Sequence, residues 1–130
     1  EGTPFDFRTA KPLGRDIDQE DPQLKNGGGY DHNFALNGEV GTLRTVGEAF
    51  SPESGIKMEI ATTQPGVQLY AANMLDPRPG KNGHTYSYRE AFCLETQHFP
   101  NGMACPSFLP PVLRAGETYH ETTVYGFTIA

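Results

Sequence analysis

Turn-forming residues interrupt this chain so often that it has little room for long helices. Its 130 residues include 15 glycines and 11 prolines, which favour turns and end regular structure. Between these turns lie six Tyr, eight Phe and many Thr, residue types that are enriched in β-strands. The spacing of the turns predicts an all-β chain of about six antiparallel strands, with the architecture of a β-sandwich.

The clearest strand signal is segment 56–60, where apolar and polar residues alternate with a period of two. A turn cluster at 51–55 precedes it, and Asn37-Gly38 is a strong signal for a two-residue hairpin. Further strands are expected at 34–36, 42–50, 67–72, 90–96 and 118–129. In the strand at 90–96, Cys93 and Glu95 are expected to face away from Phe92 and Leu94.

Two regions are predicted to be irregular. Residues 1–31 contain Pro22 and a run of three glycines at 27–29, and are expected to form at most a short strand at 5–7 and a helical turn at 16–21. The segment 99–111 holds four prolines. No internal repeat, linker or shift in composition divides the chain, so a single domain is expected over residues 1–130.

The charge of the chain argues against several classes of partner. A formal net charge of −6 provides no electrostatic footprint for nucleic acid, and the ten Lys and Arg residues form no basic run for a membrane surface. No apolar stretch approaches the roughly 20 residues of a membrane span. Two cysteines, Cys93 and Cys105, are too few for a disulfide framework and are expected to be free thiols.

Glu95 is the first candidate for chemistry. It stands in the middle of the strand Phe92–Gln97, beside apolar and aromatic neighbours. A carboxylate in a half-dry cleft is suited to act as a general base. The alternative is an ordinary glutamate on the solvated face of a strand.

Asp31 and Gln68 are candidates for ligand binding. Asp31 follows the glycine run 27–29, where the backbone can approach a ligand closely, and Gln68 lies in a predicted strand between Val67 and Leu69. The Gln68 amide can hold a sugar hydroxyl as donor or acceptor, and Asp31 beside His32 suggests a catalytic or metal-binding role. The alternatives are a loop aspartate that caps amides and a structural glutamine. His32 adjoins Asp31, but adjacent residues of an extended segment point to opposite faces.

The remaining histidines, His84, His98 and His120, show no zinc-ligand spacing, so no metal is predicted. The glycine run is not followed by the Lys-Ser/Thr of a phosphate-binding loop, and the chain contains no Gly-x-Ser-x-Gly nucleophile motif.

Five segments of the chain carry longer patterns. They are TPFDFR (residues 3–8), GYDHNF (29–34), TTQPGVQLY (62–70), AFCLETQ (91–97) and LRAGETY (113–119). In this order they closely resemble the galactose mutarotase (aldose 1-epimerase) family, except that Ala115 replaces a common proline. The resemblance covers nearly the whole chain.

The resemblance implies part of a large antiparallel β-supersandwich and a cofactor-free reaction that interconverts the α and β anomers of galactose, glucose and related aldoses. Glu95 matches the family's general base, which removes the proton of the anomeric hydroxyl. Asp31 and Gln68 match substrate-binding residues. Each positioned acid or base typically contributes about 10² to 10⁴-fold in rate.

The family's histidine acid and two further substrate-binding residues have no counterpart here. The chain is therefore expected to be the C-terminal portion of one aldose 1-epimerase domain, inactive or very slow alone, whose partners are an aldohexose and the missing N-terminal part. Its uncovered sheet edges are expected to self-associate.

Two alternatives stay open: a non-catalytic sugar-binding module, and a relative that acts on a phosphorylated hexose. A cytoplasmic location is expected, with a periplasmic or secreted one as the alternative.

Overall fold

The computed structural model describes all 130 residues, and their contacts separate into two compact units. Unit 1 comprises residues 1–32 and 68–95, and unit 2 comprises residues 33–67 and 96–130. Each unit therefore combines two stretches that are distant in the sequence. The assignment of residues 1–130 to one domain stays a prediction.

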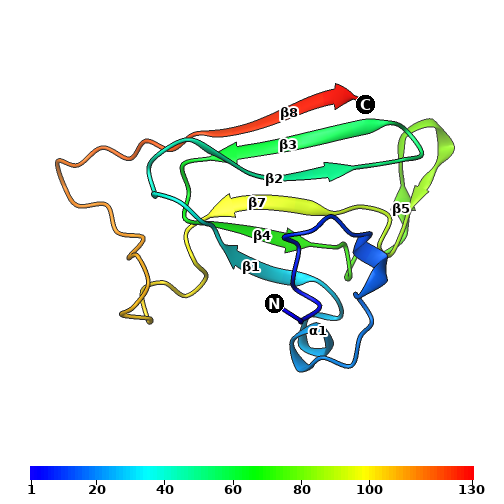
Figure 1. Ribbon diagram of the computed structural model, residues 1–130, viewed down its shortest axis with the longest axis horizontal. Helices are drawn as coiled ribbons and strands as arrows, with labels where there is room; N and C mark the ends of the chain where they lie inside the picture. The colour runs from blue at the N-terminus through cyan, green and yellow to red at the C-terminus, as the bar shows by residue number, and fades with distance from the viewer. The chain divides into compact units, whose positions relative to one another are not determined.

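The structure confirms the predicted antiparallel β architecture, and its strands form three sheets (Figure 1). The first sheet has the order β1 (Asp31–Ala35), β4 (Gly66–Tyr70), β7 (Cys93–Gln97). The second has the order β2 (Arg44–Phe50), β3 (Ile56–Thr62), β8 (Thr123–Ile129). The third pairs β5 (Arg78–Pro79) with β6 (Thr85–Tyr86). The helices are short: η1 (Leu13–Arg15), α1 (Pro22–Gly27) and η2 (Lys81–Gly83), and none is long or apolar enough to cross a bilayer.

In unit 2, β3 is the central strand of its sheet. It pairs antiparallel with β2, where Phe50 faces Lys57, and with β8, where Ile129 faces Ile56. Ile60 and Thr62 of β3 are buried, and the Thr62 hydroxyl contacts the Thr123 hydroxyl at 3.0 Å. β8 is an edge strand whose side chains beyond Thr123 are exposed.

The hairpin predicted at Asn37-Gly38 is wrong, because β1 and β2 belong to different sheets. Gly38 adopts a left-handed backbone with φ of 92°, and the Arg44 side chain packs so closely that a Cβ on Gly38 would lie 2.9 Å from its Cδ. Arg44 Nε donates to the carbonyl of Asn37 at 2.8 Å. A guanidinium from the next strand therefore fixes this bend.

The last strand begins at Thr123 and not at residue 118, so Tyr119 lies outside it. The Tyr119 hydroxyl instead accepts a 2.8 Å hydrogen bond from Gln64 Nε2. The side chain expected on the strand face therefore pairs with the amide nitrogen of a buried glutamine, whose side-chain oxygen has no partner.

The helical turn predicted at 16–21 is present as a single turn, in which the amide of Gln19 donates to the carbonyl of Asp16 at 3.1 Å, and the helix of unit 1 follows it. Asp21 accepts hydrogen bonds from the amides of Gln23 and Leu24, Pro22 occupies the first turn, and Gly28 ends the helix in a left-handed conformation with φ of 64°. Pro22 therefore begins a helix and does not interrupt one. Nor is there a strand at 5–7, because the amide of Asp6 closes a turn onto the carbonyl of Thr3 at 3.1 Å.

Tyr30 is the centre of the core of unit 1. Its ring is fully buried, with Phe5 and Phe7 packed edge-on at 5.8 and 5.2 Å, and its hydroxyl donates to the carbonyl of Pro4 at 2.8 Å. Burial raises the pKa of Tyr30 to about 12. The residue directly before Asp31 is therefore firmly anchored.

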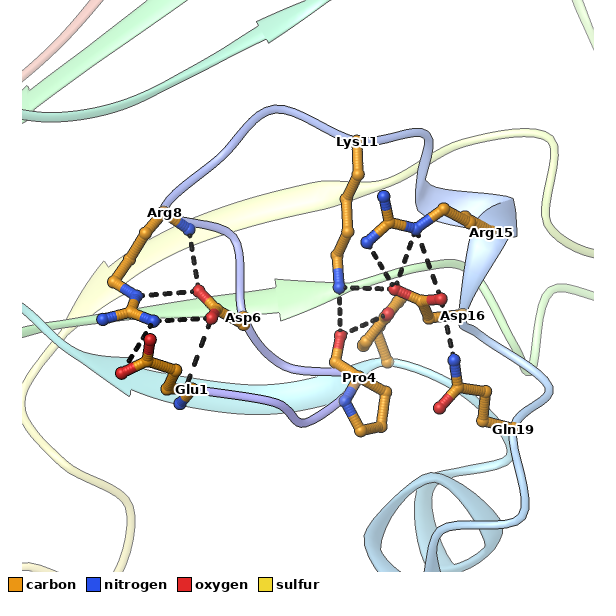
Figure 2. A network of polar contacts seen from close by, with 9 residues as sticks. Glu1, Pro4, Asp6, Arg8, Lys11, Arg15, Asp16 and Gln19 are labelled. Carbon is orange, nitrogen blue, oxygen red and sulfur yellow. Dashed lines mark hydrogen bonds and ion pairs between the residues drawn. The ribbon is translucent and has the colours of Figure 1, made fainter.

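A buried lysine binds the same Pro4 carbonyl that accepts the Tyr30 hydroxyl (Figure 2). Lys11 Nζ donates to the Pro4 carbonyl at 2.5 Å and to Asp16 Oδ2 at 2.7 Å, and its side chain is only 1% exposed. Arg15 and Gln19 also donate to the Asp16 carboxylate. This network holds the segment that covers Tyr30.

Candidate active site

The structure brings Asp31 and Gln68 together in unit 1. Asp31 begins β1 and Gln68 lies in β4, and the amide of Ala71 donates to the carbonyl of Tyr30 at 2.9 Å where the two strands meet. Gln68 Nε2 donates a 2.8 Å hydrogen bond to Asp31 Oδ1, while Gln68 Oε1 is buried and has no protein partner. A buried amide oxygen beside a carboxylate is suited to accept hydrogen bonds from ligand hydroxyls.

The His32 side chain contacts the Asp31 backbone and Phe5, and does not contact Gln68 as Asp31 does. Its Nδ1 accepts a hydrogen bond from the backbone amide of Asp31 at 3.0 Å, and its ring packs edge-on against Phe5 at 4.6 Å. When neutral, the ring therefore carries its proton on Nε2. These contacts give His32 a structural role next to the Asp31–Gln68 pair.

Glu95 lies on β7, where Cys93 and Glu95 are exposed and Leu94 is half-buried, as the sequence predicted. Phe92, expected to share the face of Leu94 within the strand, is exposed and precedes β7. Its carboxylate makes no hydrogen bond or ion pair within the chain. The half-dry setting expected for a general base is therefore not formed around Glu95 by these 130 residues.

The strand order β1-β4-β7 gives each candidate residue a strand of its own, and these strands are neighbours. Asp31, Gln68 and Glu95 also all belong to unit 1. Side-chain hydrogen bonding joins only the first two.

Two hollows lie in unit 1, and neither is lined by the three candidates. One, of about 310 Å³, is formed by the N-terminal segment: Gly2, Thr3, Asp6, Thr9, Arg15, Asp16 and Gln19. The other, of about 320 Å³, is lined by Leu13, Gly14, Ile17, Asp18, Ala71, Arg89, Glu90, Ala91 and Phe92. Both hollows are open to solvent.

The remaining histidines and cysteines form no metal site. His84 contacts Glu90 at 3.2 Å on the surface, His120 is exposed, and no group of His, Cys, Asp and Glu is arranged to hold a metal ion. Cys93 and Cys105 are free thiols.

Sequence reasoning missed Asn73 and Arg89, whose side chains reach the glycine turn before Asp31. Asn73 Nδ2 donates to the carbonyl of Tyr30 at 2.8 Å, and Arg89 Nη2 donates to the carbonyl of Gly28 at 2.9 Å. Nothing in the local pattern around either residue signals these contacts, because their acceptors lie more than 40 residues away.

Comparisons with known proteins agree on one family. The family model described as aldose 1-epimerase matches residues 1–126. The galactose mutarotase of Homo sapiens is 41% identical over 131 residues, which cover all of this chain and 36% of that protein. The aldose 1-epimerase of Escherichia coli K12 is 31% identical over 128 residues, or 97% of this chain and 37% of that protein.

A solved structure also matches the fold. The crystal structure of a GalM/aldose epimerase homologue from C. elegans superposes with a TM-score of 0.79 and 28% identity, and the match covers 98% of this chain and 37% of that one. The chain thus spans little more than a third of the length of these relatives.

Proposed function

Because the chain belongs to the aldose 1-epimerase family, we propose that it contributes to the interconversion of the α and β anomers of an aldohexose such as galactose or glucose. The observation that carries the proposal is the Asp31–Gln68 pair, in which a buried amide oxygen lies beside a carboxylate. A sugar ring presents hydroxyls on both faces, and such a pair can accept two of them.

In the proposed mechanism Glu95 is the general base. Its carboxylate takes the proton of the anomeric hydroxyl, the bond between the anomeric carbon and the ring oxygen breaks, and the ring oxygen takes a proton from an acid. The open aldehyde rotates about its bond to the next carbon, and closure in the reverse sense gives either anomer. Protons and electrons balance without a cofactor or a nucleophile.

The acid is proposed to come from outside these 130 residues. His32 is held by Asp31 and Phe5, and His84 and His120 lie on the surface. His98 is half-buried with its Nδ1 unpartnered, but it belongs to unit 2 and not to unit 1 with the three candidates. The exposure of Glu95 agrees with this view, because a base that works in a cleft needs further chain to cover it. The 130-residue chain alone is therefore expected to be inactive or very slow. We also propose that the protein acts in the cytoplasm.

The test is the rate of exchange between the anomers of galactose, measured by magnetisation-transfer NMR. The protein would be the chain alone and a chimera in which it replaces the matching 131 residues of human galactose mutarotase. We expect exchange above the uncatalysed rate in the chimera and its loss in the chimera with Glu95→Gln. A folded chimera that binds galactose without exchanging it would overturn the proposal.

The exposed, unpartnered Glu95 favours one second candidate, a sugar-binding module that does no chemistry. That candidate predicts galactose binding that survives Glu95→Gln, together with no exchange in the chimera. The same pair of measurements therefore separates the two functions.

A further inference from the structure

The glycine turn before Asp31 is held by side chains from two distant segments of unit 1. Arg89 Nη2 donates to the carbonyl of Gly28 at 2.9 Å. Asn73 Nδ2 donates to the carbonyls of Tyr30 and Gly27 at 2.8 and 3.3 Å. Three backbone carbonyls of residues 27–30 are thereby held by side chains from other segments.

The fit around Gly29 is close. Its φ is 132°, and a Cβ at this position would lie 2.4 Å from Asn73 Oδ1 and 3.1 Å from Arg89 Nη2. A side chain at residue 29 would displace both donors, so glycine is needed here for a steric reason as well as a conformational one. The glycine turn and the side chains of Asn73 and Arg89 are therefore closely packed against each other.

Arg89 is itself constrained on several sides. Its Nη1 forms an ion pair with Asp18 at 2.9 Å, its guanidinium lies 4.7 Å from the centre of the Tyr88 ring, and its backbone amide donates to the carbonyl of Ala72 at 3.1 Å. Its backbone is left-handed, with φ of 59°, and its Nε is buried without a partner. Both features are unfavourable for an arginine and persist only where the surroundings hold the residue in place.

These contacts connect the ends of all three strands that carry the candidate residues. Tyr30 directly precedes Asp31 on β1, Ala72 and Asn73 follow β4 with Gln68, and Arg89 precedes β7 with Glu95. We propose that Arg89, together with Asn73, positions Asp31 against Gln68 for sugar binding. Arg89 acts through the Gly28 carbonyl and touches no substrate, and this role rests on the proposed function.

The test compares five variants of the chimera that carries this chain by galactose affinity, from NMR titration, and by amide hydrogen exchange over residues 28–32 of this chain. Arg89→Ala is expected to speed exchange in that segment and to raise the Kd by about fivefold or more, roughly the effect of one lost hydrogen bond. Asn73→Ala should act in the same direction. Arg89→Lys should restore part of the affinity, because an ammonium can still donate to the Gly28 carbonyl.

Two variants separate this role from a general effect on stability. Asp18→Asn removes the ion pair but leaves the Gly28 contact, so it should change the Kd less than Arg89→Ala does. Arg78→Ala removes an exposed arginine whose Nε contacts only the nearby carbonyl of Asp76, and should change nothing.

Two outcomes would overturn the inference while leaving the proposed function standing. One is an unchanged Kd in folded Arg89→Ala and Asn73→Ala. The other, relevant if Arg89→Ala does not fold, is an Arg89→Lys variant with full affinity and fast exchange over residues 28–32. A chimera with the wild-type sequence that binds no aldohexose would instead remove the proposed function, and this role with it.

Discussion

Gln68 Nε2 donates a 2.8 Å hydrogen bond to Asp31 Oδ1, so a neutral amide on β4 supports a carboxylate on β1. Replacing the amide by a second carboxylate would put two like charges within hydrogen-bond distance. One of the two carboxyl groups would then have a raised pKa.

Gln68→Glu is therefore expected to make sugar binding depend on pH. Galactose affinity should fall by about tenfold at pH 7 and recover in part below about pH 5, where the pair shares a proton. Titration calorimetry or NMR at both pH values measures it. Gln68→Ala is the control, since it also weakens binding but leaves no second acid to titrate; equal affinity of Gln68→Glu at both pH values would contradict the pairing.

Glu95→Gln is expected to abolish anomer exchange without weakening the fold. Loss of a general base costs about 10² to 10⁴-fold in rate. The melting temperature should stay the same, because Glu95 is exposed and has no partner to lose. Rates are measured by NMR in the chimera. Glu59→Gln, an exposed glutamate of β3, is the matched control and should keep full exchange.

Lys11→Met is expected to destabilise the chain most at neutral pH. Lys11, and after it Arg15, hydrogen-bond the Asp16 carboxylate and hold its pKa below the ordinary value. A lowered folded pKa stabilises the fold above the unfolded value of about 3.9, and this contribution is lost as the pH falls through the folded value. The difference in melting temperature between wild type and Lys11→Met should thus be large at pH 7 and shrink below about pH 4.

Thermal melts followed by circular dichroism between pH 2 and 7 provide this comparison. Lys25→Met removes an exposed lysine that pairs with Glu20 and should have little effect at any pH. A difference for Lys11→Met that grows in acid would show that the network does not stabilise the fold through Asp16.

Phe127→Lys is expected to reduce self-association of the chain. β8 is a sheet edge, residues 122–130 contain neither charge nor proline, and Phe127 and Ile129 are 66% and 78% exposed. Edges of this kind pair with other strands, and a lysine on the edge opposes such pairing. Sedimentation velocity over a range of concentrations tests this. Met103→Lys, an equally exposed apolar residue outside the sheets, should leave the association unchanged.

The sequence predicted those elements whose signal is local. The alternation at 56–60 corresponds to β3, and the turn at 51–55 joins it to β2. The hairpin predicted at Asn37-Gly38 was wrong because a hairpin forms only where the two flanking strands pair, and β1 and β2 belong to different sheets. Arg44, which holds that bend, contacts the carbonyls of Thr62 and Gln64 as well.

The candidate site was predictable only in its residue types. The motifs pointed to Asp31, Gln68 and Glu95, but no local pattern could show that the first two meet across 37 residues of sequence. Arg89 could not be found at all, since its left-handed backbone and its reach to Gly28 arise from tertiary contacts. The exposure of Glu95 could not be predicted either, because it depends on the tertiary contacts around β7.

The interleaving of the two units limits how this protein can be dissected. The chain passes from one unit to the other after residues 32, 67 and 95, so no single cut releases either unit whole. A deletion that runs past residue 32 from the N-terminus, or past residue 96 from the C-terminus, removes parts of both units. Point substitutions are therefore the appropriate tool for mapping the function of each unit.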